Sequence, residues 1–251
     1  MYDELSADYD RFVDWPSRLD AELPFIERQL QAVAARTVLD AACGTGMHTL
    51  ALAEKGYEVA GTDISAPMIE VARTQAAASR ATARFEVAGF GEASSLVGTG
   101  FDAVLCLGNS LPHALSAEDL NAALLDFSRC LRPGGLLLVQ NRNFDAVLAR
   151  RARWMDPQGH DEGRVEHIFV RFYDFEPDGT LTFNMVTLHR KDTSRWQQRI
   201  GSTRLQPLRR QDLEEPLELA GFGDICYWGD MKGALFDPGH SPNLIVTARK
   251  T

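Results

Sequence analysis

Two kinds of hydrophobic pattern alternate along this chain. Short, nearly continuous apolar runs read as buried strands, at residues 37–42, 57–62, 83–88, 101–107 and 135–140. Between them, alanine-rich segments place apolar residues at helical spacing, at residues 46–55, 66–79 and 117–131. Strands that are apolar on both faces need helices on both sides, so the pattern predicts a doubly wound parallel sheet.

The pattern changes after Asp145, where strict alternation replaces the continuous runs. Residues 165–175 and 180–189 alternate around a turn at 176–180, and a third strand is expected at 194–205. This antiparallel sheet would follow the fifth strand and lie above the carboxyl ends of the parallel strands, where ligands bind. A helix at 210–220 and strands at 222–229 and 243–249 then complete the main sheet as an antiparallel pair.

The fold class expected is therefore α/β. A doubly wound, seven-stranded, mostly parallel, Rossmann-like sheet would carry an inserted small antiparallel sheet as a lid. We divide the chain into residues 1–145, 146–206 and 207–251: a helical lead with the ligand-binding core, the lid, and the completion of the core sheet. The lead is an amphipathic helical segment over residues 1–35.

A glycine turn follows the first strand, in the run Asp40-Ala41-Ala42-Cys43-Gly44-Thr45-Gly46. Two glycines let the backbone bend sharply and admit a ligand, and the next helix offers free N–H groups. Nineteen residues after Gly44, Asp63 ends the second strand, where a carboxylate can accept both ribose hydroxyl protons. Together they predict a ligand that contains adenosine.

The spacing of the turn distinguishes two adenosine ligands. A dinucleotide site favours a third small residue, whereas Thr49 is β-branched. Asp40 would repel a pyrophosphate but suits a ligand with an ammonium and a sulfonium. In this Asp-x-x-x-Gly-x-Gly turn and the later acid, the chain resembles the class I S-adenosylmethionine-dependent methyltransferases. An NAD-dependent dehydrogenase and an ordinary tight turn are the alternatives.

Length and composition limit the classes of protein to which the chain can belong. At 251 residues and 45% apolar content, one elaborated α/β domain is expected. The start is acidic and no stretch reaches the length of a membrane span, so we expect a cytoplasmic protein without a membrane partner. The four cysteines lack CxxC spacing and the six histidines are scattered, which predicts free thiols and no metal.

The net charge of -9 argues against nucleic acid as a partner. Residues 142–210 are nevertheless basic, with 13 Lys and Arg against 9 Asp and Glu. Arg150, Arg151 and Arg153 beside Trp154 leave RNA contact as an alternative to a solvated helix face. We expect a small-molecule substrate and no nucleic acid, and the number of subunits, including a homo-oligomer, stays open.

Polar segments follow the fourth and fifth strands. They read Leu107-Gly108-Asn109-Ser110-Leu111-Pro112-His113 and Arg142-Asn143-Phe144-Asp145, and Gly229-Asp230-Met231-Lys232 comes later. In these motifs and their order the chain resembles the glycine and sarcosine N-methyltransferases, over roughly residues 10–250. The resemblance implies transfer of a methyl group from S-adenosylmethionine to the nitrogen of a small amine or amino acid.

The resemblance also implies how an acceptor is positioned. Arg142 would hold its carboxylate with a bidentate fork, and Asn109 would add a hydrogen bond. The alternatives are an ion pair of Arg142 with Asp145, an interaction of Arg142 with a helix dipole, and a turn role for Asn109. Methyl transfer needs mainly alignment, so we assign no general base.

The contacts with the cofactor come partly from the glycine turn and partly from the resemblance. Met68 and Phe90 would face the adenine, although either could simply pack in the core. Arg18 would bind the methionine carboxylate, although it could instead lie on a surface helix. His113 could equally be an ordinary loop histidine. The complete expected set is Tyr9, Arg18, Asp40, Ala42, Gly44, Gly46, Asp63, Ile64, Met68, Gly89, Phe90, Leu107 and His113.

Some positions depart from the family. Phe144 stands where the family has tyrosine, and residues 201–204 replace a tyrosine-rich stretch, in a chain with five tyrosines. The acceptor pocket has therefore changed. A larger amine, an amino-acid derivative or an oxygen nucleophile is compatible with the same donor site. A non-catalytic S-adenosylmethionine-binding module is a further alternative, which would need neither Arg142 nor a lid.

Overall fold

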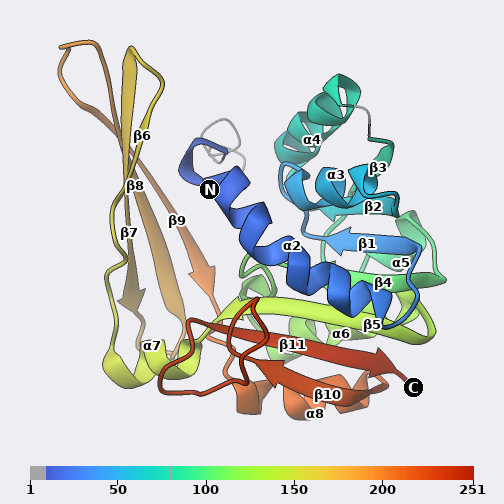
Figure 1. The fold of residues 1–251 in the computed structure, drawn as a ribbon. Helices are drawn as coiled ribbons and strands as arrows, with labels where there is room; N and C mark the ends of the chain where they lie inside the picture. The colour runs from blue at the N-terminus through green and yellow to red at the C-terminus, as the bar shows by residue number, and fades with distance from the viewer. Residues whose placement is uncertain (1–9, 80) are drawn as a thin grey trace.

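A computed structural model describes residues 10–79 and 81–251 (Figure 1). Its seven-stranded sheet has the order β10-β11-β5-β4-β1-β2-β3. These strands are β1 (Thr37–Ala41), β2 (Glu58–Asp63), β3 (Ala83–Val87), β4 (Phe101–Cys106), β5 (Leu131–Arg142), β10 (Phe222–Trp228) and β11 (Asn243–Lys250). The described helices are α2 (Trp15–Gln31), α3 (Met47–Glu54), α4 (Ala66–Ala78), α5 (Ala93–Leu96), α6 (Ala117–Cys130), α7 (Phe144–Arg150) and α8 (Glu214–Leu219), with 3-10 turns η1 (Leu111–His113) and η2 (Arg210–Asp212).

The topology confirms the expected doubly wound sheet. β1 runs parallel to both β2 and β4, and β4 runs parallel to β5. β11 pairs with β5 and β10 in antiparallel fashion. The chain proceeds outward through β2 and β3 and then returns to β4 on the other side of β1. The carboxyl ends of β1 and β4 therefore mark the point at which such sheets bind ligands.

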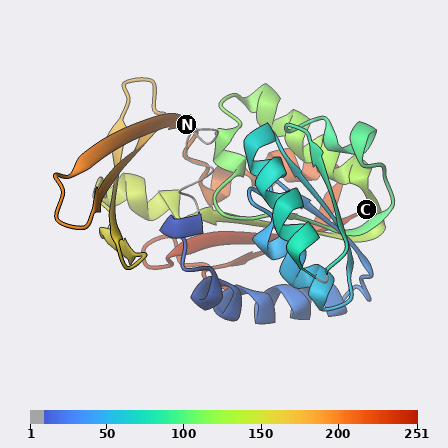
Figure 2. The same cartoon turned by 90° about the horizontal axis from the view of Figure 1, so that it is seen from above.

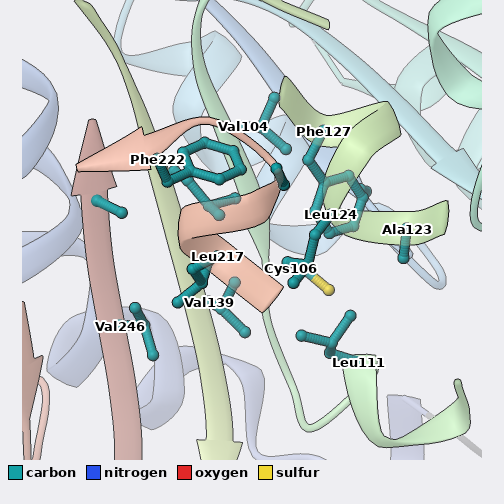
Figure 3. Close-up of a cluster of buried hydrophobic side chains, with 14 of the residues drawn as sticks. Val104, Cys106, Leu111, Ala123, Leu124, Phe127, Val139, Leu217, Phe222 and Val246 are labelled. Carbon is teal, nitrogen blue, oxygen red and sulfur yellow. The ribbon is translucent and has the colours of Figure 1, made fainter. Parts of the chain in front are cut away.

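Alternation along the strands divides the core between the two faces of the sheet. Val38 packs with Phe25 and Leu52 on the side of α2 and α3. Its neighbour Leu39 belongs to the cluster on the other side, beneath α6 and α8. Figure 3 shows part of that second cluster, in which Phe127 of α6 lies among side chains from the strands and α8. Both faces are thus covered, which explains the nearly continuous apolar strands.

A second sheet forms the expected lid, in the order β6-β7-β8-β9. Its strands are β6 (Gln158–Asp161), β7 (Val165–Phe175), β8 (Leu181–Lys191) and β9 (Gln197–Leu205). It stands beside the core sheet, on the side toward which β1 points, as both views show (Figures 1 and 2). An apolar cluster joins it to α7, with Phe144 and Val147 against Tyr173, Leu181 and Leu205.

Several boundaries differ from those expected. The helical lead contains α2, which begins after Asp14, whose side chain accepts from the Ser17 N–H at 3.3 Å. The third lid strand begins at Gln197 and not at 194, because Ser194 closes a turn with Lys191. The short strand β6 was not expected, since Gln158–Asp161 has no apolar alternation.

Two more differences concern the ends of the core elements. The helix expected over 210–220 is divided into η2 and α8, and a glycine with φ +83°, Gly221, follows the second part. β5 begins at Leu131, before the strand expected at 135–140, and its pairing with β4 is irregular near this start. Ser65 caps α4 by accepting from the Met68 N–H at 3.4 Å. No described helix is long and apolar enough to cross a bilayer.

Gly46 provides the first test of this packing. It has φ +82°, and a Cβ atom there would lie 2.8 Å from the Phe85 ring, so Gly46→Ala adds a clash to backbone strain. Gly56 has φ +93° and open space around it, so Gly56→Ala measures the strain alone. We expect urea denaturation to show a loss of about 1 kcal/mol for Gly56→Ala and roughly 2–4 kcal/mol for Gly46→Ala. Equal losses would contradict the clash.

Candidate active site

Two cavities open at the carboxyl edge of the core sheet. The first has a volume of about 610 Å³ and is lined by residues that follow β1, β2, β3 and β4. The second, about 530 Å³, lies between the core and the lid sheet. Gly108, in the loop after β4, lines both. A molecule bound in one cavity can therefore meet a molecule bound in the other beside this glycine.

The glycine turn shapes the floor of the first cavity. Ala42, Gly44 and Gly46 have φ values of +62°, +57° and +82°, which bend the chain sharply between β1 and α3. The Asp63 carboxylate accepts from the Gly44 N–H at 2.8 Å and from the Ser65 N–H at 2.9 Å. These bonds orient a carboxylate toward the cavity, and its oxygens can accept further hydrogen bonds, as from a ribose.

The far wall of the first cavity is apolar. Ile64, Met68, Gly89 and Phe90 line it together with Glu92. Ile64 is 77% exposed, which is unusual for a large apolar side chain inside a cavity. Phe90 packs edge-on against another ring of the core, with centroids 5.8 Å apart. The Glu92 carboxylate accepts from the Gly89 N–H at 2.8 Å. An acid at one end and apolar side chains at the other fit an adenosine.

Three residues expected at the cofactor line neither cavity. Asp40 is 2% exposed and accepts from the Thr49 hydroxyl at 2.7 Å, and burial raises the pKa of its carboxyl. Gly46 lies against Phe85. Leu107 is packed in the cluster beneath α2. Their contact with the cofactor stays a prediction, and in the structure they pack behind the residues that line the cavities.

Tyr9, the remaining residue of the expected set from the N-terminal segment, lies outside the described residues.

A buried carboxylate, which the sequence patterns did not single out, connects the elements around the site. Glu22 of α2 accepts from His48 Nε2 at 2.7 Å, Arg18 Nε at 3.1 Å and Gln140 Nε2 at 2.9 Å. Gln140 in turn accepts from the Gly108 N–H at 3.1 Å. The sequence contained one signal for this network: Glu22 is an acid on the apolar face of the lead helix, and a buried charge needs partners.

Two opposing effects determine the pKa of Glu22. Burial favours the neutral acid, but the hydrogen bond from His48 and the charge of Arg18 outweigh it, and the pKa of the carboxyl falls to about 2. The Arg18 guanidinium also lies 5.1 Å from the Trp15 ring centroid. A Cβ on Gly108 would be 3.4 Å from Arg18 Nη2, so this guanidinium lies where the two cavities meet.

His113 lies on η1 at the contact between core and lid. It lines the first cavity together with Thr203 of β9. Burial lowers the pKa of its imidazole to about 4, although a hydrogen bond with the backbone of Arg204 acts in the opposite direction. The ring is therefore neutral at pH 7.

Asn109 and Arg142, the two expected acceptor residues, are brought together at the second cavity. Asn109 has φ +67°, its N–H donates to the Gln140 carbonyl at 3.0 Å, and its Oδ1 accepts from the Arg142 N–H at 2.9 Å. The side-chain oxygen thus connects the loop after β4 to the end of β5. This is the turn role that was the alternative for Asn109, and it positions Arg142.

The Arg142 guanidinium has few partners. Its Nη1 lies 3.7 Å from Met155 Sδ, and its buried Nε has no hydrogen-bond partner. The alternative ion pair with Asp145 is not formed; that carboxylate accepts from the Arg210 N–H at 3.3 Å. Arg171 and Tyr173 of β7 line the same cavity, and sequence reasoning missed both. Within residues 10–79 and 81–251, no group of three or more potential metal ligands gathers.

Comparison with known proteins agrees with this geometry. The family described as a methyltransferase domain matches residues 38–135. The chain is 29% identical over 232 residues to a glycine/sarcosine N-methyltransferase of Aphanothece halophytica, covering 89% of this chain and 80% of the relative. It is 34% identical over 190 residues to the glycine/sarcosine N-methyltransferase of Parasynechococcus marenigrum, covering 72% and 67%.

A solved structure agrees over the whole fold. The S-adenosylmethionine-dependent methyltransferase of Clostridium acetobutylicum has a TM-score of 0.77 at 17% identity, covering 99% of this chain and 98% of that one. The fold and the matches together place the chain in the class I S-adenosylmethionine-dependent methyltransferases, with S-adenosylmethionine as its methyl donor. Within that class it belongs to the family that contains the glycine/sarcosine N-methyltransferases.

The low pKa of Glu22 makes a prediction about acid stability. Because the pKa is about 2 in the folded protein and usually 4.5, the charged carboxylate stabilises the fold fully above about pH 4.5. Its contribution is lost as the pH falls toward 2. Near neutral pH, Glu22→Gln should lower the free energy of unfolding by about 3 kcal/mol, and the difference from wild type should shrink below pH 4.5.

Urea denaturation at several pH values between 3 and 7.5 measures this difference. The matched control is Glu54→Gln, which changes an exposed acid of α3 and should have little effect at any pH. A cost for Glu22→Gln that stays constant down to pH 3 would contradict the role of the charge.

Proposed function

We propose that the protein transfers a methyl group to the nitrogen of a small amine that carries a carboxylate. The observation that carries this proposal is the Arg142 guanidinium, whose buried Nε is unpaired and which lines the cavity next to the donor site. A guanidinium binds a carboxylate in a bidentate geometry, which fixes direction as well as charge. The names of the relatives, glycine/sarcosine N-methyltransferases, support the same class of acceptor.

The donor would occupy the first cavity in one orientation. Asp63 would accept from the ribose hydroxyls, and the wall of Ile64, Met68 and Phe90 would cover the adenine. Glu92, which the sequence analysis did not include, is placed to accept from the exocyclic amine. Arg18 at the junction would hold the methionine carboxylate. In this orientation the methyl group lies beside Gly108 and faces the second cavity.

The chemistry then requires alignment more than acid or base. The nitrogen lone pair forms the new N–CH₃ bond as the S–CH₃ bond of S-adenosylmethionine breaks, its electron pair stays on sulfur, and the ammonium releases a proton to water. Arg142 fixes the carboxylate end of the acceptor, which orients its nitrogen. Asn109 holds the Arg142 backbone, and the lid excludes bulk water. Such positioning is the main contribution an enzyme makes to this reaction.

Two other kinds of acceptor, a larger metabolite and RNA, are the alternatives. The volume of about 530 Å³ also admits a larger metabolite with a nitrogen or oxygen nucleophile. The basic run that left RNA contact as an alternative is engaged within the chain: Arg151 lies 4.6 Å from the Phe175 ring centroid, and Arg153 pairs with Asp174 at 2.6 Å. Arg150 donates to the Gly239 carbonyl. The basic run thus makes contacts within the chain.

The proposal is tested by S-adenosylhomocysteine formation, followed by mass spectrometry with a panel of acceptors. The panel contains glycine, sarcosine, dimethylglycine, other amino acids, the same amines without a carboxylate, and phenols. A carboxylated amine as the best acceptor supports the proposal. Donor binding without turnover of any member would favour a non-catalytic module, and turnover of phenols alone would favour O-methylation.

Arg142→Met should raise the acceptor KM and lower kcat/KM for the acceptor by roughly 30- to 1000-fold, because the carboxylate loses a charged bidentate partner. The donor KM should change by less than about threefold, because Arg142 lines the second cavity and not the first. Arg142→Lys keeps the charge without the fork and should lie between the two. Equal effects on both KM values would contradict the assigned role.

Asp63→Asn should weaken the binding of the donor and not that of the acceptor. Its amide keeps the size of the side chain but loses the charge and one acceptor, so donor affinity should fall by roughly 10- to 100-fold. Calorimetric titration with S-adenosylhomocysteine measures this. The acceptor KM at saturating donor should stay near wild type, and an unchanged donor affinity would show that Asp63 only supports the turn.

A further inference from the structure

We propose that the acceptor carries two anionic groups, one held by Arg142 of the core and the other by Arg171 of the lid. This inference rests on the proposed function and narrows its substrate class. The preferred acceptor would be an amine with a carboxylate and a second oxyanion, and not glycine itself. Arg171 is then a specificity-determining residue of the same reaction.

The register of the lid sheet places Arg171 in the second cavity. It is paired with Met185 across β7 and β8, and the next pair on the same face is Tyr173 with Phe183. All four side chains line the second cavity. Arg171 is thus the charged residue of the lid face that lines this cavity, beside the polar Gln158 of β6 and the apolar or aromatic side chains.

The contacts of Arg171 leave its positive charge unpaired. Its Nη2 donates to the Asp156 carbonyl at 3.3 Å, and its guanidinium lies 4.5 Å from the Phe12 ring centroid. Its Nε is buried without a hydrogen-bond partner, as is that of Arg142. Arg142 and Arg171 line one cavity, and each has a buried Nε–H without a hydrogen-bond partner, which costs free energy.

The two cations also affect each other. Burial is the main reason that the pKa of Arg171 is lowered, and the charge of Arg142 lowers it further, with Asp156 a weaker influence in the opposite direction. A like-charged pair in a partly buried cavity is unfavourable until anions bind. One carboxylate forms a bidentate pair with one guanidinium fork, and a second oxyanion would give the other fork a bidentate partner of its own.

The other acids around this cavity are already engaged. Asp14 accepts from the Ser17 hydroxyl at 2.6 Å, and Glu22 is held in the network of the core. Asp174 pairs with Arg153. The cavity volume of about 530 Å³ is in the range that holds ligands well above the size of glycine. The charge and the space both favour an acceptor with a second anionic group.

The test compares three dianionic amino acids with their neutral counterparts: aspartate with asparagine, glutamate with glutamine, and O-phosphoserine with serine. The first two pairs present a carboxylate as the second group and the third presents a phosphate. Initial rates of S-adenosylhomocysteine formation give kcat/KM for each acceptor. Calorimetric titration of the S-adenosylhomocysteine complex gives binding independently of turnover.

We expect at least one dianion to exceed its neutral partner by 30-fold or more in kcat/KM and in affinity. In Arg171→Gln this preference should fall to within about threefold, and an unchanged affinity for S-adenosylhomocysteine, which binds in the first cavity, shows that the variant is folded. Arg171→Lys should retain part of the preference. Arg190→Gln is the matched control, because Arg190 also lies on the lid but pairs with Glu166.

The outcomes separate the two proposals. Turnover of monocarboxylate amines with no preference for any dianion overturns this inference and leaves the proposed function standing. A preference that survives in Arg171→Gln overturns the role of this residue. If no amine is methylated, the proposed function fails, and the calorimetric titrations still decide whether Arg171 binds a second oxyanion.

Discussion

The buried carboxylate of Glu22 is the interaction on which the site depends. It receives hydrogen bonds from α2, α3 and β5 within one small volume, and through Gln140 it reaches the N–H of Gly108. Gly108 is the residue that the two cavities share. A charge removed from water must be satisfied from several sides, so this network fixes the lead helix relative to the strand ends. The junction at which a donor methyl would meet an acceptor is therefore held rigid from beneath.

The two cavities divide the function between two parts of the chain. The first is made mostly by loops of the parallel sheet, and its acid, glycines and apolar wall suit the donor that the whole class uses. The second combines Arg142 from the end of β5 with lid residues such as Arg171 and Tyr173. A fold can keep its cofactor site and change its substrate when the substrate is bound by an inserted element. We propose that Arg142 and Arg171 of the second cavity determine this chain's own acceptor specificity.

The prediction from sequence succeeded where the signal was local. Strand and helix positions followed from periodicity, and the glycine turn after the first strand followed from residue type. Side chains whose position depends on distant elements gave no such local signal. Asp40 and Leu107, which were expected at the cofactor, are buried: Asp40 accepts from Thr49 of α3, and Leu107 packs in the cluster beneath α2. Glu92 was not among the expected residues, although it lines the first cavity. Spacing along the chain does not tell which face of a loop points into a cavity.

The sequence by itself determined the doubly wound sheet, the antiparallel insertion, the adenosine site and the family, because hydrophobic periodicity, turn chemistry and short motifs act over a few residues. Only the tertiary structure decided that Glu22 joins α2, α3 and β5 and that Asn109 accepts from the Arg142 N–H. Only the tertiary structure placed Arg171 in the same cavity as Arg142 of β5. The pairing of β7 with β8 sets the face on which Arg171 lies. The physical reason is that charge, burial and hydrogen bonding are properties of a place in the fold, and each such place is assembled from segments whose separation in sequence carries no local signal.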